Sequence, residues 1–280
     1  MTKKQIIPLI IICSLLALIL VLFGAVFCLR STTVEIGEGV AYSSGEIVKA
    51  AKLKNGKSIF MQNKQQAINN IENKFADLKV VQIKTTSLTT LEIKVRKREP
   101  LFYIKTATKF YVVDEELKVL NIIEFNGTNE PTNLVLLDYS YSKLGISEST
   151  TVCDFLADEH LRRVTYTLFV AMHNTVKIDD VDGNEQPIKR FVEREDIPSL
   201  VKKIAFSTDV TLKGSYNCVI LSTVSGVVID IGKPENDMER KVNTCFSAYS
   251  SADVDNTSGT IKLFYDKNNI EKIAYFPEEI

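Results

Sequence analysis

One run of residues limits what this chain can fold into. The twenty-four residues from Ile6 to Leu29 contain no charged side chain, and a helix of about 20 residues is long enough to cross the hydrocarbon core of a bilayer. A cleaved signal peptide has a shorter apolar core, of roughly 7 to 15 residues, followed by small residues at the cleavage site. Here the run ends in Phe27-Cys28-Leu29-Arg30. We therefore predict an uncleaved transmembrane helix over residues 6–29.

Basic residues beside this run predict its orientation. Lys3 and Lys4 lie in the tail of residues 1–5, whereas only Arg30 follows the run directly. An excess of Lys and Arg marks the cytoplasmic side of a membrane helix. We expect residues 1–5 in the cytoplasm. The 250 residues from 31 to 280 would lie outside it, and they are enough for one or two domains.

Charge is distributed unevenly outside the predicted helix. Residues 31–100 carry twelve Lys and Arg against seven Asp and Glu, and residues 101–280 carry nineteen against twenty-eight. A basic membrane-proximal part is attracted to an anionic membrane, while an acidic distal part favours basic protein partners and disfavours nucleic acid. An ordinary solvated surface would also account for these counts, so composition alone leaves both interpretations open.

The segment after the predicted membrane helix has the pattern of a small α+β domain. Apolar residues at helical spacing follow a capping box at Ser43 and Glu46, and again follow a possible cap at Asn63. Alternation of apolar and polar residues predicts the strands. The predicted order is strand, helix, helix, strand, strand, at residues 33–42, 43–51, 63–76, 81–85 and 91–95. The two helices would cover one apolar sheet face, burying Leu91, Ile93 and Val95.

Beyond Pro100 the sequence is rich in strand patterns. Seven strands are predicted, at residues 109–114, 117–123, 134–137, 218–223, 227–231, 259–265 and 270–276. Two helices interrupt them, at residues 154–173 and 235–249. The whole chain is therefore predicted as α+β: one N-terminal transmembrane helix, a small β-α-α-β-β domain, and a β-rich mixed α/β distal domain.

Patterns of catalytic or ligand-binding chemistry are missing from the sequence. His160 and His173 are the only histidines of the chain, so a histidine-based catalytic triad has little support. The segment 179–183 fails the calcium-loop spacing, since Ile178 and Lys189 fall at ligand positions, and it is interpreted as a polar turn. The sequence contains no glycine-rich phosphate loop. We expect no enzyme activity, no cofactor, no metal and no small-molecule substrate.

Five stretches, taken in order, resemble the bacterial division proteins FtsQ and DivIB. Residues 56–60 are similar to the family's entry to its second helix. Residues 90–100 are similar to a family strand, although Lys97-Arg98-Glu99 replaces the family's Glu-Arg-x before the proline. Residues 111–120 resemble the hairpin pattern Leu-Val-Asp-x-x-Gly-x-Val-Leu without its glycine. Residues 241–249 and 260–265 resemble the closing helix and strand.

This resemblance implies an architecture and a location. Residues 30–100 would be a POTRA domain, and residues 101–280 a distal β domain with partner-docking strands. The chain would be a single-pass protein of the bacterial cell membrane, located at the division septum. Members of the family catalyse no reaction: they bind membrane-anchored partners of the FtsL and FtsB/DivIC type and recruit septal wall synthesis.

The resemblance also implies a binding site, in which the partner adds a strand to the last strand pair by β-augmentation. Tyr275 and Phe276 would be its aromatic anchors, with Tyr275 on the exposed side. The predicted partner-binding residues are Thr260, Lys262, Phe264, Tyr265, Ile270, Ile273, Ala274, Tyr275 and Phe276.

Other interpretations stay open. Two ordinary edge strands of a core sheet would have the same alternation without any partner. A membrane-anchored extracytoplasmic cell-wall enzyme would need a nucleophile, a base or a metal constellation, which we do not find in the sequence. A POTRA-containing export or sensor module would need a following barrel or a cytoplasmic output. A pull-down of membrane partners would separate these hypotheses.

Overall fold

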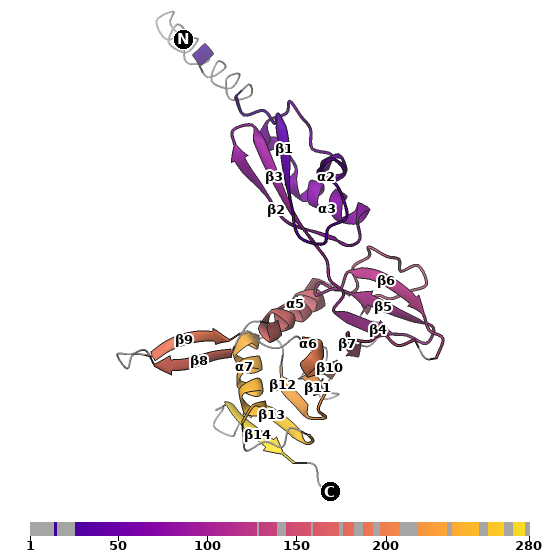
Figure 1. The fold of residues 1–280 in the computed structure, drawn as a ribbon, viewed down its shortest axis with the longest axis vertical. Helices are drawn as coiled ribbons and strands as arrows, with labels where there is room; N and C mark the ends of the chain where they lie inside the picture. The colour runs from indigo at the N-terminus through magenta and orange to yellow at the C-terminus, as the bar shows by residue number, and fades with distance from the viewer. Residues whose placement is uncertain are drawn as a thin grey trace, which may run out of the picture. The chain divides into compact units, whose positions relative to one another are not determined.

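The structure is a computed structural model that describes residues 14–15, 26–127, 129–138, 144–157, 159–173, 176–181, 187–192, 197–207, 218–233, 237–251, 257–265 and 271–277. Two compact units divide the chain, Met1–Glu99 and Pro100–Ile280, and each is described by itself (Figure 1). Most of the transmembrane helix predicted at residues 6–29 lies outside the described residues. Within the described ranges, no helix combines the length and apolarity needed to cross a membrane.

The first unit has its elements in the predicted order, with both helices on one face of a three-stranded sheet (Figure 1). The central strand β3 pairs in parallel with β1 and antiparallel with β2. The elements are β1 (Ser31–Ile36), α2 (Ser44–Ala51), the 3-10 turn η1 (Ile59–Met61), α3 (Lys64–Lys74), β2 (Leu78–Ser87) and β3 (Thr90–Lys97). The sequence thus predicted every helix and strand of this unit, because each has a clear apolar period.

Side-chain caps set where the two helices begin. Ser43 and Glu46 form the predicted capping box at the start of α2, and the Asn63 side chain accepts a hydrogen bond from the Gln66 N–H at the start of α3. Such caps satisfy backbone donors that have no partner inside the helix. The predictions of both helix starts are confirmed.

The core of the first unit lies between the sheet and the helices. Leu91, Ile93 and Val95 are buried there, as predicted, together with Ile47 of α2 and Ile71 of α3. The core extends to Leu29, which is fully buried. The last residue of the run predicted as a membrane helix is therefore part of the folded unit.

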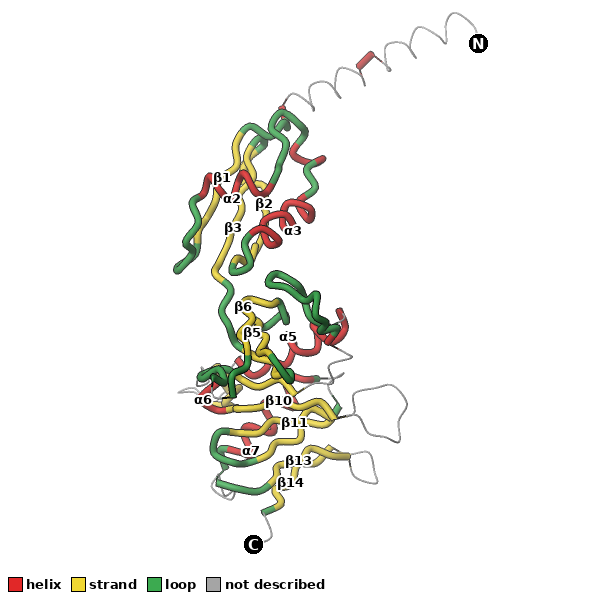
Figure 2. The backbone as a smooth tube through the Cα atoms, turned by 90° about the vertical axis from the view of Figure 1, so that its right-hand side faces the viewer, coloured by secondary structure: helices red, strands yellow, loops and turns green. Residues whose placement is uncertain are grey.

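The second unit is built around a nine-stranded sheet. Its strand order is β14-β13-β12-β11-β10-β7-β4-β5-β6. Figure 2 labels β10, β11, β13 and β14 in this order, and β12 lies between β11 and β13. These strands are β4 (Phe102–Lys105), β5 (Lys109–Val113), β6 (Val119–Glu124), β7 (Val135–Asp138), β10 (Val201–Ser207), β11 (Cys218–Thr223), β12 (Val228–Gly232), β13 (Thr260–Tyr265) and β14 (Glu271–Phe276). A separate hairpin joins β8 (Val176–Val181) and β9 (Pro187–Val192).

Within the described ranges, the helices that accompany this sheet include α5 (Glu159–His173), α6 (Ile197–Leu200) and α7 (Met238–Tyr249). The helices α5 and α7 pack on each other, and α7 packs on β12, β13 and β14. Their apolar sides join the strands in one core, represented by Leu168, Val242, Leu221, Ile229 and Ile261. The prediction of a mixed α+β fold with large sheets is confirmed.

Several local predictions in the second unit were incomplete or wrong. The strands β4 and β10 were not predicted. Asp179–Val181, interpreted as part of a polar turn, belongs to the strand β8. The helix predicted from residue 154 begins at Glu159, because Phe155 instead forms a β-bridge with Lys118. In each case a pairing decided the structure: β4 pairs with β5 and β7, β8 with β9, β10 with β7 and β11, and Phe155 with Lys118.

Candidate partner-binding edge

The strand β14 lies at the end of the nine-stranded sheet. Among the strands that the structure describes, it pairs only with β13, over the register from Thr260 opposite Phe276 to Tyr265 opposite Glu271. Alternate residues of such a strand direct their N–H and C=O groups away from the sheet. The backbone of β14 can therefore accept a further strand.

The neighbouring strands hold this edge in register. On its other side β13 pairs in parallel with β12, with Asp230 opposite Lys262. The Lys262 Nζ lies 3.7 Å from a carboxylate oxygen of Asp230. This pair is on the sheet face opposite the apolar core, since Ile261 and Leu263 on either side of Lys262 are buried.

The two faces of the strand pair differ in character. Toward α7, Ile261 and Leu263 are buried, and Ile273 and Tyr275 pack against the same core. The outer face carries three cross-strand pairs, Thr260 with Phe276, Lys262 with Ala274 and Phe264 with Lys272. We call these six residues the outer face of the edge.

The alternation along β14 was predicted correctly, but the exposed side was not. Tyr275 was predicted to face outward, whereas its ring packs against the core and its hydroxyl donates a 3.0 Å hydrogen bond to the Ser258 carbonyl oxygen. A Cβ at Gly259 would lie 2.7 Å from the Tyr275 ring, so glycine at that position leaves room for the ring. Phe276, which is 50% exposed, is the aromatic side chain on the outer face.

The other predicted site residues fall into three groups. Thr260, Lys262, Phe264, Ala274 and Phe276 lie together on the outer face. Ile273, like Tyr275, is on the core side and supports the strand from beneath. The backbone of Tyr265 pairs with Glu271, while Ile270 lies outside the described residues.

Sequence reasoning left Lys272 out of the predicted set. It lies opposite Phe264 and is exposed. Its position two residues before Ala274 placed it on the same face as Phe276, so the alternation itself contained the signal. The outer face therefore combines two lysines with two aromatic rings, a composition that suits a partner strand with apolar and acidic side chains.

The helix α7 braces the edge from the core side. Met238, Val242, Cys245 and Phe246 turn toward the sheet and are buried. Lys241, although charged, is 3% exposed and donates a 2.7 Å hydrogen bond from Nζ to the Lys233 carbonyl oxygen beyond β12. These contacts hold the last strands on a rigid support, which lowers the entropy lost when a partner docks.

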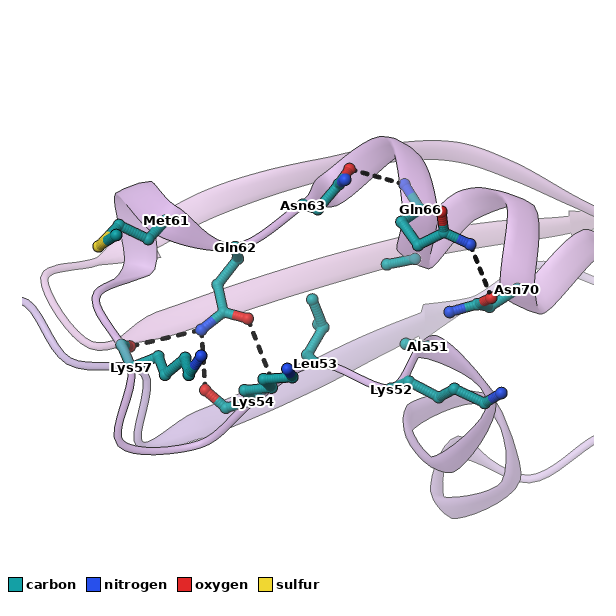
Figure 3. A pocket seen from close by; sticks show the side chains of 11 residues that line it. Ala51, Lys52, Leu53, Lys54, Lys57, Met61, Gln62, Asn63, Gln66 and Asn70 are labelled. Atoms are coloured by element: carbon teal, nitrogen blue, oxygen red, sulfur yellow. Dashed lines mark hydrogen bonds between the residues drawn. The ribbon is translucent and has the colours of Figure 1, made fainter.

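The first unit has a pocket between the end of α2 and the start of α3, with a volume of about 240 Å³ (Figure 3). Its lining side chains are lysines, amides and apolar groups, without a histidine, cysteine or carboxylate. A nucleophile or a base in this pocket could come only from Lys52, Lys54 or Lys57. In the parts of the chain that the structure describes, no three potential metal ligands come together.

Part of the chain is similar to a known protein. The chain is 29% identical over 139 residues to the cell division protein DivIB of Clostridium acetobutylicum, a match that covers 50% of this chain and 53% of that protein. The chain thus matches about half the length of this curated relative. No protein-family model matches the chain.

Proposed function

We propose that this chain, an FtsQ/DivIB-family cell-division protein, is a non-enzymatic scaffold of the divisome. In this proposal it binds membrane-anchored partners of the FtsL and DivIC type and supports septum formation. The observation that carries the proposal is the open edge strand β14, which has its backbone available and its outer face exposed.

Docking at this edge would proceed by β-augmentation. An extended segment of the partner would pair with the backbone of β14, and its side chains would meet the outer face of the edge on alternate positions. Phe276 would provide apolar contact area, and Lys262 and Lys272 would favour acidic residues in the partner. The core-facing Tyr275 would act indirectly, because its hydrogen bond to Ser258 keeps the strand in place.

The proposal includes location in the cell membrane. The uncharged run that begins at Ile6 would span the bilayer once, ending before Phe27 to Leu29, which pair with the first unit. Lys3 and Lys4 would lie in the cytoplasm. Both units would then lie on the extracytoplasmic side. A partner with its own membrane span would meet the chain in the same plane, which raises the effective concentration of the two proteins.

The test is a pair of matched single substitutions in the full chain. Phe276→Asp places a charge on the outer face of the edge, at a side chain that is 50% exposed. Val152→Asp places one at an apolar side chain that is 41% exposed. Val152 precedes Cys153, whose N–H bonds to β6 at the opposite end of the sheet. We expect Phe276→Asp to reduce co-purification with a DivIC-type partner by at least about tenfold, as for a hot-spot residue, and Val152→Asp to have no effect.

Circular dichroism must show that both variants remain folded. Equal partner capture by the folded Phe276→Asp variant and the parent chain would contradict docking at this edge. An equal loss in both variants would also contradict it, because the effect would then not be specific to β14.

A further inference from the structure

We propose that the end of the first unit where the chain enters from residue 26 rests in the interfacial layer of an anionic membrane. The inference depends on the membrane anchor of the proposed function and adds a second contact with the same bilayer. We call this surface the entry end. It consists of the apolar residues Phe60, Met61 and Leu88 and the basic residues Arg30, Lys52, Lys54, Lys57, Lys64 and Lys84.

Backbone hydrogen bonds hold the entering chain against the loop before α3. The Leu29 N–H donates to the Lys57 carbonyl oxygen at 2.9 Å, and the Ile59 N–H donates to the Phe27 carbonyl oxygen at 2.7 Å. Cys28 forms a β-bridge with Ser58. Phe27, Cys28 and Leu29, the last residues of the predicted span, are thus hydrogen-bonded to the loop that carries Phe60 and Met61.

The turn between β2 and β3 lies at the same end. The Arg30 N–H donates to the Thr89 carbonyl oxygen at 2.9 Å, and the first residue of β1, Ser31, pairs with Thr90. Leu88 is in this turn. Three segments distant in sequence therefore meet where the chain enters the unit.

The apolar side chains at the entry end are unusually exposed. Met61 is 81% exposed, Phe60 is 69% and Leu88 is 56%. The Phe60 ring lies 5.4 Å from the Phe27 ring, centroid to centroid, and so continues the apolar surface of the entering chain. Clustered exposed apolar groups of this kind mark an interaction surface.

The charge around them is mostly positive. Residues 26–34, 52–71 and 84–91 contain six Lys and Arg, of which Lys84 forms an ion pair of 2.6 Å with Glu92. Long basic side chains can keep their charge at lipid headgroups while apolar neighbours enter the acyl region. Each one near an anionic surface adds to the electrostatic attraction. Exposed apolar side chains with basic neighbours match the interfacial layer of an anionic bilayer. Because the entering chain is hydrogen-bonded to this end of the unit, the surface would lie next to that bilayer.

The loop that carries these groups is ordered before any contact. The Gln62 side chain donates to the carbonyl oxygens of Lys54 at 2.8 Å and Lys57 at 3.4 Å, and accepts from the Lys54 N–H at 3.0 Å (Figure 3). Gln62 thereby closes the loop across the pocket and fixes the backbone between the two lysines. Binding to the membrane would then cost little ordering entropy.

The chain contains no tryptophan, so a single introduced tryptophan reports the environment of its own position. The full chain is reconstituted in phosphatidylcholine vesicles with phosphatidylglycerol, carrying Phe60→Trp, Met61→Trp or Leu88→Trp. The control is Val81→Trp. Val81 is 47% exposed and lies in β2, the strand that leads to the turn with Leu88. It lies seven residues earlier, or roughly 23 Å along an extended strand.

Brominated lipids quench tryptophan only near the acyl chains. We expect blue-shifted emission and severalfold stronger quenching at positions 60, 61 and 88 than at position 81. Lys54→Glu combined with Lys57→Glu should reduce the quenching of Phe60→Trp in phosphatidylglycerol vesicles. Unchanged quenching in that variant would overturn the role of the basic residues.

Alkaline carbonate extraction tests the membrane anchor independently of the entry-end contact. A chain that stays in the vesicles, with weak quenching at all four positions, would overturn the entry-end contact and leave the anchored scaffold intact. A chain that carbonate releases would overturn both. Quenching equally strong at Val81 would also overturn the inference, because the contact would not then be confined to the entry end.

Discussion

At the scale of single residues, Arg98 is the largest side chain that is completely buried. Its Nε donates a 2.9 Å hydrogen bond to the Leu78 carbonyl oxygen, and its Nη2 lies 3.0 Å from a Glu72 carboxylate oxygen. The other Glu72 oxygen accepts from the Val80 N–H at 2.8 Å. One buried ion pair therefore joins α3, the start of β2 and the end of β3.

Removing one partner of this pair should destabilise the first unit strongly. We expect Arg98→Ala to lower the free energy of unfolding by about 3 to 5 kcal/mol, because the Glu72 carboxylate would remain without its buried partner. The control is Lys97→Ala at the exposed neighbour, which should change it by less than about 0.5 kcal/mol. Urea unfolding of the full chain measures both. Similar values for the two variants would mean that the ion pair contributes little.

Leu117 departs from the family's hairpin pattern, in which a glycine occupies this position. Its φ of +60° is in the left-handed region that favours glycine. Its side chain, however, is fully buried in the core of the second unit. Burying a leucine side chain stabilises a fold by about 2 to 5 kcal/mol. The left-handed conformation costs about 1 to 2 kcal/mol, so burial outweighs the strain.

Two substitutions of Leu117 separate these opposing effects. Leu117→Gly should lower the free energy of unfolding by about 1 to 4 kcal/mol, since the lost burial exceeds the strain relieved. Leu117→Ala should lower it by about 1 kcal/mol more than Leu117→Gly, because alanine keeps the strained φ and loses most of the side chain. A glycine variant more stable than the parent would show that the leucine side chain adds nothing.

At the scale of elements, the capping box of α2 shows how a short sequence pattern becomes a helix boundary. The Ser43 hydroxyl donates to the Glu46 carboxylate at 2.7 Å, and the Ser43 N–H donates to it at 2.9 Å. These two hydrogen bonds, the hydroxyl first, hold the pKa of Glu46 below its ordinary value of 4.5. The charged form of Glu46 is therefore favoured in the folded state.

This lowered pKa predicts how stability changes with pH. Glu46 contributes stability above its unfolded pKa of about 4.5, and the contribution is lost as pH falls through the lower folded value. The unfolding free energy of the parent chain minus that of Glu46→Gln should thus be larger at about pH 7 than at about pH 3. Ser43→Ala should remove most of this difference. A gap that does not change with pH would contradict the prediction.

At the scale of the whole molecule, the chain is organised in two compact units. The first unit holds the entering chain through Leu29, and the second carries the open strand β14. Under the proposed function, anchoring and docking would belong to different cores, so a substitution in one unit could leave the fold of the other intact.

The predicted topology can be tested on intact cells. Because Lys3 and Lys4 precede the uncharged run, we expect both units to lie outside the cytoplasm. Protease added to protoplasts should digest residues 31–280, and protease added to inverted vesicles should leave them protected. Protection of these residues in protoplasts would contradict the predicted orientation.

The sequence by itself determined the elements that have a strong local period. The element order of the first unit, the caps at Ser43 and Asn63, and the buried side of β3 were predicted correctly, because each depends on residues close together in sequence. The first strand, however, ends at Ile36 and not at the predicted residue 42. The order of the motifs also resembled that of the division-protein family, and the 29% identity to DivIB over half of this chain supports the resemblance.

Only the tertiary structure decided which residues meet across long separations. In β14 both alternating sets contain apolar residues, so the pattern could not tell that Tyr275 faces the core and Phe276 faces outward. The strand order of the nine-stranded sheet and the pairing of Arg98 with Glu72 are equally absent from the local pattern. Periodicity shows that a strand has two faces, but the helix that packs on one of them determines which face is buried.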